Sequence, residues 1–413
     1  MTAAPDFLDE KKALACIHCG LCLGACPTYL QTGNENESPR GRIYIMRALA
    51  AGRLPVDDAS VQHIDLCLGC RACEVACPSG VQYGALLEQT RDFIEREHSR
   101  SAYQTFLRRF VIERIFPVPW RMKLALGPAR MLKALGIARF LPAAFREPLR
   151  LLPEKMDSTS LPETSHATKQ PAIGRVGFVR GCVMSVMFGN TNAASVRLLN
   201  EAGFDVVVPR EQECCGALFA HSGRMEMARD YARRNIRAFA KYNLDAIVIN
   251  AAGCGSTLKE YGHLLDGDVS AEKFGGMVKD LTEFLVTHGF AARKFASWPE
   301  RVTYHDACHL AHPQRITKQP RELVKAVAGA NYVELAEADV CCGSAGTYNL
   351  TEPEMAEALQ GRKVRNILNT GAKTVVTTNP GCIMQIRAGL EKNGVRVMHI
   401  ADFLVEAMEN TRA

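Results

Sequence analysis

The chain has 413 residues, enough for two or three domains of ordinary size, and its 47% hydrophobic residues support a sizeable core. Its formal net charge of +6 is too mild to indicate a nucleic-acid-binding protein. No run of about 18 apolar residues predicts a transmembrane helix, and residues 1–12 lack the apolar segment of a secretory signal. Without export, disulfides are not expected, so the 16 cysteines indicate metal or redox chemistry.

Two matching cysteine runs lie near the N-terminus, each with the spacing C-x2-C-x2-C-x3-C-P. This run holds [4Fe–4S] clusters in two-cluster bacterial ferredoxins, where the fourth cysteine ligates the other cluster. We therefore expect two neighbouring clusters that act as an electron wire. The expected ligands are Cys16, Cys19, Cys22 and Cys77 for the first, and Cys67, Cys70, Cys73 and Cys26 for the second. Structural zinc, the alternative, prefers paired C-x2-C knuckles separated by a longer loop.

The segments around these runs have helical patterns. Ser38 is a suitable N-cap for a helix that Gly52 ends. Further helices are expected at about 59–65 and 84–100. Residues 1–100 are therefore predicted to form an α-helical ferredoxin-type domain that binds two clusters.

The next segment changes character. Residues 100–150 carry eleven Arg and Lys against two acidic residues, interleaved with apolar and aromatic side chains. Prolines are expected to divide it into short helices, at positions 117, 119, 128, 142 and 148. Such a basic amphipathic stretch suits a membrane surface or an acidic partner, and a solvated linker is the alternative. With the aperiodic residues 151–172, it is assigned as a connector and linker, 101–172.

From residue 173 onward the chain repeats itself. The pattern Cys182, Cys214-Cys215-Gly216, Cys254 recurs as Cys308, Cys341-Cys342-Gly343, Cys382, at offsets of 126, 127 and 128 residues. A repeat this regular implies two similar cysteine-rich domains, 173–297 and 298–413.

Short apolar strands alternate with helices in each half, which predicts a duplicated α/β domain with mainly parallel sheets. The expected strands span 176–180, 205–208 and 246–250, then 302–304, 332–335 and 374–377. The expected helices of the first half span 192–202 and 224–241. Each repeated cysteine follows a strand, so the cysteines of one half should meet at one edge of its sheet.

The chemistry of the repeated cysteines stays open at this point. Four thiols per half suit a further iron–sulfur cluster, a zinc ion or a redox thiol pair, and buried free cysteines are the alternative. His305, His309 and His312 flank Cys308 and are interpreted as hydrogen-bonded groups, with a ligand or proton-relay role as the alternative. Arg71 is interpreted as a solvated surface charge, or as a charge that raises the potential of the second cluster.

The repeated C…CCG…C pattern resembles the cysteine-rich CCG domain of heterodisulfide reductase. The whole chain resembles the iron–sulfur subunit of bacterial glycolate oxidase, a layout shared with anaerobic glycerol-3-phosphate dehydrogenase and lactate-oxidising complexes. The stretches that carry the resemblance are residues 37–42 (ESPRGR), 304–309 (YHDACH) and 341–346 (CCGSAG). Heterodisulfide reductase ends each repeat with C-x2-C, where this chain has Thr257 and Gln385, so its five-thiolate site is incomplete here.

No G-x-G-x-x-G or phosphate loop follows a strand, so we expect no flavin, no catalytic residue and no substrate-oxidising site in this chain. The resemblance implies an electron-transfer subunit of an oxidoreductase acting on CH–OH donors. It would pass electrons from FAD-containing glycolate or D-lactate oxidase subunits, through two [4Fe–4S] clusters, to the quinone pool or another acceptor. We expect it in the cytoplasm, peripheral on the inner face of the membrane, without nucleic acid. The alternatives are a heterodisulfide-type thiol–disulfide reductase, the glycerol-3-phosphate dehydrogenase subunit, or a scaffold that docks a flavoprotein.

Overall fold

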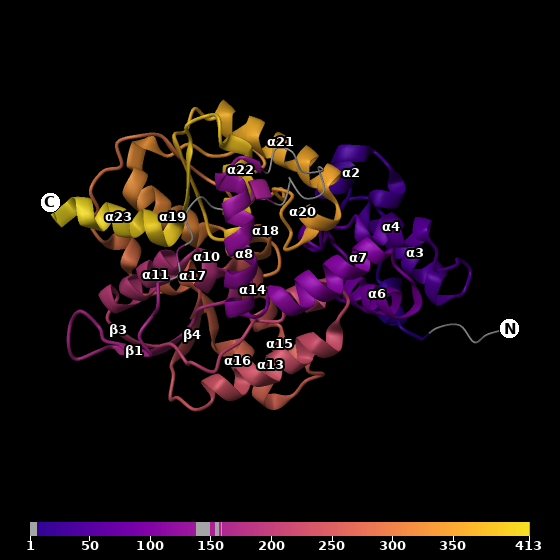
Figure 1. The fold of residues 1–413 in the computed structure, drawn as a ribbon, viewed down its shortest axis with the longest axis horizontal. Coiled ribbons are helices and arrows are strands. Elements are labelled where there is room, and N and C mark those ends of the chain that lie inside the picture. Colours follow the sequence, from indigo (N-terminus) through magenta and orange to yellow (C-terminus); the bar gives the residue numbers. More distant parts are fainter. Residues whose placement is uncertain (1–5, 138–148, 153–156, 158, 413) are drawn as a thin grey trace.

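A computed structural model describes residues 6–137, 149–152, 157 and 159–412 of the chain. The N-terminal helices form one end of the molecule, and the two sheets with their helices form the rest (Figure 1). No helix among these residues is long and apolar enough to cross a membrane. The expected breaks at prolines 142 and 148 lie outside the described residues.

The N-terminal region is helical, as predicted. Its helices are α1 (Glu10–Leu14), α2 (Pro27–Thr32), α3 (Pro39–Ala50), α4 (Asp58–Asp65), α5 (Ala72–Val75) and α6 (Tyr83–Glu97). The predicted cap at Ser38 is confirmed, because its Oγ accepts the Gly41 N–H at 3.0 Å. These helices surround a core that includes the fully buried Met46, Ile64 and Leu86. The sequence pattern therefore identified the helices that frame both cysteine runs.

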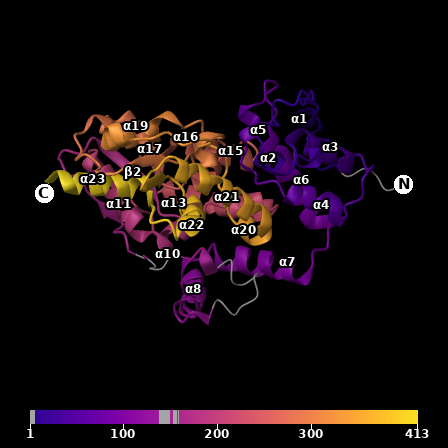
Figure 2. The ribbon, with the colours of Figure 1, turned by 90° about the horizontal axis from the view of Figure 1, so that it is seen from above.

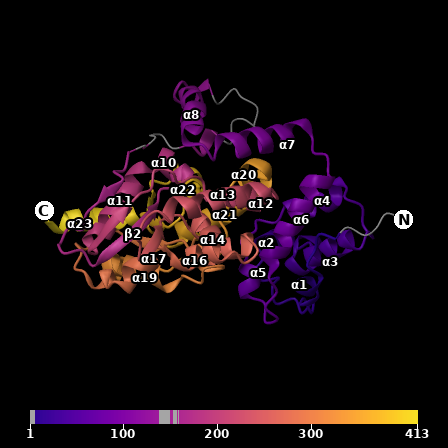
Figure 3. The same ribbon diagram turned by 90° about the horizontal axis from the view of Figure 1, so that it is seen from below.

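The connector forms α7 (Ala102–Phe106), the π-helix η2 (Leu107–Ile115) and α8 (Pro119–Ala134). Figures 2 and 3 show α7 and α8 along one side of the molecule, with α7 toward the N-terminal helices and α8 beside α10 (Cys182–Met187) of the α/β part. The predicted helix break before Pro119 is confirmed, because α8 begins there. The predicted break at Pro128 is wrong, because Pro128 lies inside α8. Because proline has no N–H, the carbonyl of Leu124, four residues earlier, lacks its helical hydrogen bond. Leu124 is 70% exposed, so water can satisfy this carbonyl.

The first sheet has five strands in the order β1-β3-β2-β4-β5. They are β1 (Thr164–Ser165), β2 (Gly174–Val179), β3 (Phe204–Val207), β4 (Ala246–Ile249) and β5 (Val278–Asp280). All neighbours pair in parallel except β1, which runs antiparallel to β3. The helices α11 (Gly189–Glu201) and α13 (Met225–Phe239) confirm those predicted. β1 lies in the segment predicted to be a linker, so part of that segment belongs to the sheet.

The second sheet has three parallel strands in the order β6-β7-β8. They are β6 (Val302–Tyr304), β7 (Thr374–Thr377) and β8 (Arg396–His399), with helices α19 (Lys318–Ala328), α21 (Pro353–Asn369), α22 (Pro380–Leu390) and α23 (Ile400–Arg412). The strand predicted at 332–335 is reduced to a single bridge between Val302 and Tyr332. Next to this bridge, the Val333 carbonyl accepts a side-chain hydrogen bond from the Thr303 hydroxyl, at 2.8 Å.

The two halves share one core. Phe178 and Leu198 of the first half pack in the same cluster as Tyr304, Leu323 and Phe403 of the second. All five side chains are fully buried. The two repeats therefore fold against one another, and this fixes the position of each cysteine set relative to the other.

Candidate metal centres

The first cysteine set surrounds a small cavity near the surface. The cavity is lined by Cys16, Cys19, Cys22 and Cys77, together with Ile17, His18, Gly20, Arg40, Pro78 and Ser79. Arg40 holds the loop, because its Nη1 donates to the His18 carbonyl at 3.0 Å. Cys19 is exposed, whereas the other three thiols of the set are partly covered. The fourth cysteine of the second run thus lies with the first run.

The second set lies deeper. A second small cavity is lined by Cys26, Cys67, Cys70 and Cys73, each at most 8% exposed. The Tyr83 hydroxyl donates to the Cys67 sulfur at 3.5 Å, and the Gly69 N–H donates to the same sulfur at 3.4 Å. Burial raises the pKa of Cys70 and Cys73 well above the ordinary thiol value. Thiolates at these positions therefore require a metal or another positive charge.

A buried arginine supplies positive charge beside this set. Arg42 is 1% exposed, and its Nη2 lies 2.5 Å from the Glu37 carboxylate. Its Nε donates to the His63 carbonyl at 2.7 Å, and its Nη1 lies 4.0 Å from the Cys26 sulfur. Burial works against the guanidinium charge, but nearby Cys67 and other acidic groups outweigh it and raise the pKa of Arg42. The residues of the stretch 37–42 therefore brace the second set, a role that the sequence analysis did not assign.

The loop of the second run contacts both α/β halves. His309 Nε2 lies 3.0 Å from the Gly69 carbonyl, and Arg71 Nη1 lies 2.6 Å from the Glu260 carboxylate. The interpretation of Arg71 as a solvated charge is wrong, because it pairs with two carboxylates, the second being Glu74 at 2.9 Å. Cys70 itself packs in one apolar cluster with Cys341 and Cys308. The second set therefore adjoins the cysteines of the second α/β half.

All eight repeated cysteines line a single cavity of about 510 Å³. They are Cys182, Cys214, Cys215 and Cys254 from the first half, and Cys308, Cys341, Cys342 and Cys382 from the second. The connector covers this cavity, which it lines with side chains that include Phe106, Val111, Met122 and Leu126. The cysteines of each half were expected to meet at the edge of their own sheet. The structure goes further, because the two edges face the same cavity.

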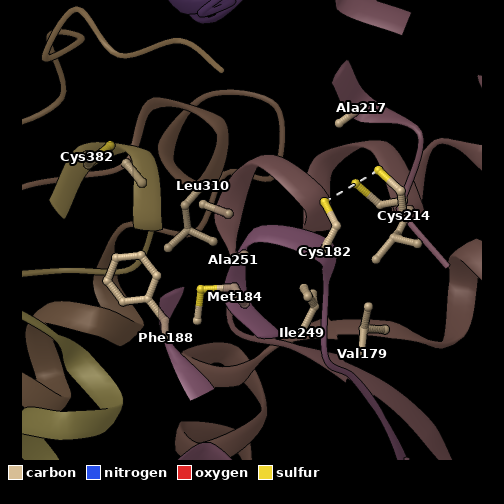
Figure 4. Close-up of a cluster of buried hydrophobic side chains, with 14 of the residues drawn as sticks. Val179, Cys182, Met184, Phe188, Cys214, Ala217, Ile249, Ala251, Leu310 and Cys382 are labelled. Carbon is tan, nitrogen blue, oxygen red and sulfur yellow. Dashed lines mark hydrogen bonds between the residues drawn. The ribbon is translucent and has the colours of Figure 1, made fainter. Parts of the chain in front are cut away.

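Within each half the four thiols form a chain of neighbours. Figure 4 shows Cys182 and Cys214 pointing toward one another, with 3.6 Å between their sulfurs. The hydrogen bond with Cys214, followed by burial, raises the pKa of Cys182 well above the ordinary value. As at Cys70 and Cys73, the Cys182 thiol stays protonated unless a metal stabilises its thiolate. Four neighbouring cysteines form a donor set that suits soft metals and iron–sulfur clusters.

The glycine after each cysteine pair has a specific role. Gly216 and Gly343 adopt positive φ angles of 87° and 90°, which side-chain-bearing residues rarely adopt. A Cβ on Gly216 would lie 3.2 Å from the Ala228 carbonyl oxygen, and one on Gly343 would lie 2.4 Å from the Ala356 carbonyl oxygen. Both glycines therefore let a following helix, α13 or α21, pack directly against the cysteine turn. This explains why the motif is CCG in both halves.

The three histidines near Cys308 behave differently from one another. His309 and His312 each bond a backbone carbonyl, as predicted, the second being that of Asp339 at 3.1 Å. His305 is fully buried, and neither ring nitrogen makes a hydrogen bond. The interpretation of His305 as a hydrogen-bonded group is therefore wrong.

A helical domain with two cysteine runs is joined here to a pair of cysteine-rich α/β domains. This is the architecture of an iron–sulfur electron-transfer subunit. Residues 12–81 match the 4Fe-4S dicluster domain family, and residues 176–259 and 302–387 each match the cysteine-rich domain family CCG. The chain therefore carries [4Fe–4S] clusters.

Full-length relatives identify the family. The chain is 40% identical to the probable glycolate oxidase iron-sulfur subunit of Bacillus subtilis (strain 168), over 97% of this chain and 95% of that protein. It is 32% identical to the glycolate oxidase iron-sulfur subunit of Escherichia coli (strain K12), over 96% and 94% respectively. Lactate utilization protein A of Exiguobacterium sp. is 31% identical over 55% of this chain and 96% of its own length. The chain belongs to the family of glycolate oxidase iron–sulfur subunits.

Proposed function

We propose that this chain carries electrons to a quinone from an FAD-containing subunit, and that this subunit oxidises glycolate or D-lactate. The names of the relatives support the donor substrates. The observation that carries the proposal is a series of three adjoining cysteine sites. The surface set packs in one cluster with the buried set, and the buried set adjoins the large cavity. Such a series leads from the surface to the interior of the molecule.

We assign the ligands from this geometry. One [4Fe–4S] cluster is held by Cys16, Cys19, Cys22 and Cys77, and the other by Cys26, Cys67, Cys70 and Cys73. When bound, each cluster supplies a one-electron carrier, so two of them can accept a flavin's electron pair one electron at a time. Around the second set, the Tyr83 hydroxyl, the Gly69 N–H and the Arg42 guanidinium stabilise negative charge on the sulfurs.

The surface set is the proposed entry point for electrons. Cys19 is exposed, and three large apolar side chains nearby are also exposed: Leu14 at 53%, Ile17 at 69% and Leu21 at 62%. A cluster of exposed apolar side chains beside a redox site is typical of a protein-docking surface. We assign this patch to the FAD-containing subunit, because the flavin must come close to the first set.

The connector is the proposed membrane face. Its exposed side chains include the apolar Phe106, Phe110, Trp120, Leu124, Met131 and Leu135, and the basic Arg109, Arg114, Arg121 and Lys123. Exposed aromatic and aliphatic side chains mixed with basic ones suit an anionic lipid surface. The large cavity lies directly beneath these helices and has many apolar lining residues. A quinone, whose ring and tail are largely apolar, suits that cavity as electron acceptor.

The experiment is a metal and spectroscopic analysis of the chain purified without oxygen. We expect at least about eight iron atoms and eight acid-labile sulfides per chain, the content of two four-iron clusters. The reduced protein should give a low-temperature EPR spectrum of two interacting clusters. In the Cys26→Ala variant, the signal of the buried cluster should change while that of the surface cluster stays. Iron well below eight atoms per chain would refute the proposal.

A second candidate is thiol–disulfide chemistry, favoured by the 3.6 Å separation of the Cys182 and Cys214 sulfurs. It predicts disulfide turnover that depends on Cys214 and Cys341. If Ala variants at both positions leave turnover unchanged, this candidate is excluded. If the chain only transfers electrons to quinone, no disulfide turnover is expected, because that reaction requires no disulfide substrate.

A further inference from the structure

His305 occupies an unusual position in the second α/β half. It directly follows β6, and its backbone N–H donates to the Val376 carbonyl of β7 at 2.9 Å. Its side chain is 0% exposed, and neither Nδ1 nor Nε2 has a hydrogen-bond partner of acceptable geometry, although the Ala338 carbonyl lies nearby. An imidazole buried in this way loses its hydrogen bonds to water without replacement, which is energetically unfavourable. Such a group calls for an explanation.

The explanation lies in its two neighbours. Cys342 belongs to the CCG turn, and Cys382 lies in the first turn of α22, which follows β7. One ligand atom from each of His305, Cys342 and Cys382 lies within 4.8 Å of the other two, and all three residues are buried. Among the described residues, no other trio of histidine, cysteine or carboxylate groups comes this close together. Three separate segments therefore aim their donor atoms at one point.

We propose that His305, Cys342 and Cys382 bind a single divalent transition-metal ion, zinc by the type of its ligands. Zinc bonds thiolate sulfur at about 2.3 Å and imidazole nitrogen at about 2.0–2.1 Å, so tetrahedral ligand atoms lie roughly 3.5–3.8 Å apart. A separation of at most 4.8 Å approaches that spacing with small side-chain shifts. The metal would take the lone pair of the buried imidazole, which has no other partner.

The first half lacks this ligand set. At the offset of 126 residues that relates Cys308 to Cys182, the position of His305 is taken by Val179, which is buried at the end of β2. The second half also has Lys363, 2% exposed, whose ammonium donates to the Glu337 and Ala338 carbonyls. The two repeats are therefore chemically different, with thiols alone in one and thiols plus imidazole in the other.

Nearby positive charge favours thiolates at this site. The ammonium of Lys363 interacts with the thiols of Cys341 and Cys342, and this offsets part of the cost of its own burial. A divalent ion with two thiolates is neutral overall, which suits a site without solvent. The proposal concerns the metal content of one α/β half, so it stands or falls independently of the route of electrons to the acceptor.

The test is metal analysis and X-ray absorption on the full chain purified without oxygen. We expect one zinc or mononuclear iron ion per chain beyond the cluster iron, with both sulfur and imidazole nitrogen as nearest neighbours. The His305→Ala variant should lose about one ion per chain while it keeps the iron of the two N-terminal clusters. The matched control is His312→Ala, a nearby buried histidine that already has a hydrogen-bond partner, and it should keep the ion.

Two outcomes would overturn the proposal. One is a metal content that is the same in His305→Ala and in the unsubstituted chain. The other is a nearest-neighbour shell of sulfur alone in the unsubstituted chain, which tests the proposal even if the variant does not fold.

Discussion

His309 Nε2 lies 3.0 Å from the carbonyl oxygen of Gly69, a bond that joins the second α/β half to the loop between Cys67 and Cys70. The carbonyl must accept, so this ring nitrogen carries the proton. The hydroxyl of Tyr348 makes a parallel contact, donating to the Leu66 carbonyl at 2.9 Å. The buried cysteine set is therefore anchored to the half whose cysteines it adjoins.

The His309→Ala variant should loosen this loop. A buried hydrogen bond of this kind contributes about 1–2 kcal/mol, so amide exchange in residues 66–70 should become about tenfold faster. Hydrogen exchange with mass spectrometry measures this directly. The exchange of α23, which packs against α11 and α19, should stay unchanged. Equal exchange in the loop of both proteins would show that the contact does not hold it.

Alanine at the CCG glycines should destabilise the protein unequally. A Cβ at Gly343 meets the Ala356 carbonyl oxygen at 2.4 Å, whereas one at Gly216 lies 3.2 Å from its nearest neighbour. Both positions also have positive φ, which costs an alanine about 1–2 kcal/mol. We therefore expect losses of about 1–3 kcal/mol at Gly216 and clearly more at Gly343, measured by chemical denaturation. Gly276→Ala is the control, because nothing lies within 4 Å of its Cβ, and it should be neutral or slightly stabilising.

Replacing Arg42 by methionine should cost roughly 3–5 kcal/mol, because it removes the guanidinium that pairs with the buried Glu37 carboxylate and leaves only the His63 ring beside it. It should also lower the reduction potential of the buried cluster, since a positive charge near Cys26 is lost. Thermal unfolding and a redox titration measure the two effects. In the control variant Arg233→Met, an exposed ion pair with Asp230 is lost, and the stability should change by less than about 1 kcal/mol. An unaltered potential in Arg42→Met would contradict the electrostatic role.

The predictable parts of this structure are those with local signals. The spacing of the cysteine runs, the cap at Ser38 and most of the apolar strands before the repeated cysteines are readable in sequence. The structure has the corresponding helices and strands, except that the strand predicted at 332–335 is a single bridge. β5 (Val278–Asp280) and β8 (Arg396–His399) were missed, because each is short and includes charged residues. Pro128 misled because the carbonyl that it leaves without a helical partner, at Leu124, lies on the exposed side of α8, where water can satisfy it and the helix continues.

The candidate site was less predictable, because its main features depend on how the two halves pack. One shared cavity arises only when both sheet edges face each other beneath the connector. The isolation of His305 depends on the absence of partners from several segments, which no local pattern reports. By contrast, the close approach of a helix to each CCG glycine could be anticipated, since glycine is required where a Cβ would collide.

Acid should destabilise the protein through His399. Its Nε2 donates to the Asn250 carbonyl at 2.7 Å, and its Nδ1 accepts the Ala401 N–H at 3.1 Å. Burial lowers its pKa from 6.5 to about 4. Between these values the unfolded chain binds a proton that the folded chain does not. The stabilisation is therefore complete above pH 6.5 and falls as the pH decreases toward 4, by about 2 kcal/mol between pH 7 and pH 5.

Chemical denaturation of the chain at pH 7 and pH 5 checks this effect. In His399→Gln, which cannot take up the proton, the loss of stability on acidification should be smaller by about 2 kcal/mol. The same loss in both proteins would mean that other groups account for the pH dependence.

The connector should bind anionic membranes through its outer face. Trp120 and Leu124 are 63% and 70% exposed, so serine at both positions should weaken binding to vesicles of anionic phospholipid about tenfold or more. Sedimentation of the protein with vesicles measures this. Val269→Ser is the control, because Val269 is 79% exposed in α16 (Val269–Met277), away from the connector. Equal losses in the control would show that the connector has no special role.

The most direct test follows the electrons in the assembled complex. This chain is combined with its FAD-containing partner without oxygen, glycolate or D-lactate is added, and samples frozen within one turnover are examined by EPR. We predict that both N-terminal clusters become reduced as the flavin is reoxidised, and that Cys73→Ser slows transfer to quinone while flavin reduction continues. The account is contradicted if the clusters remain oxidised while the complex reduces quinone at its full rate.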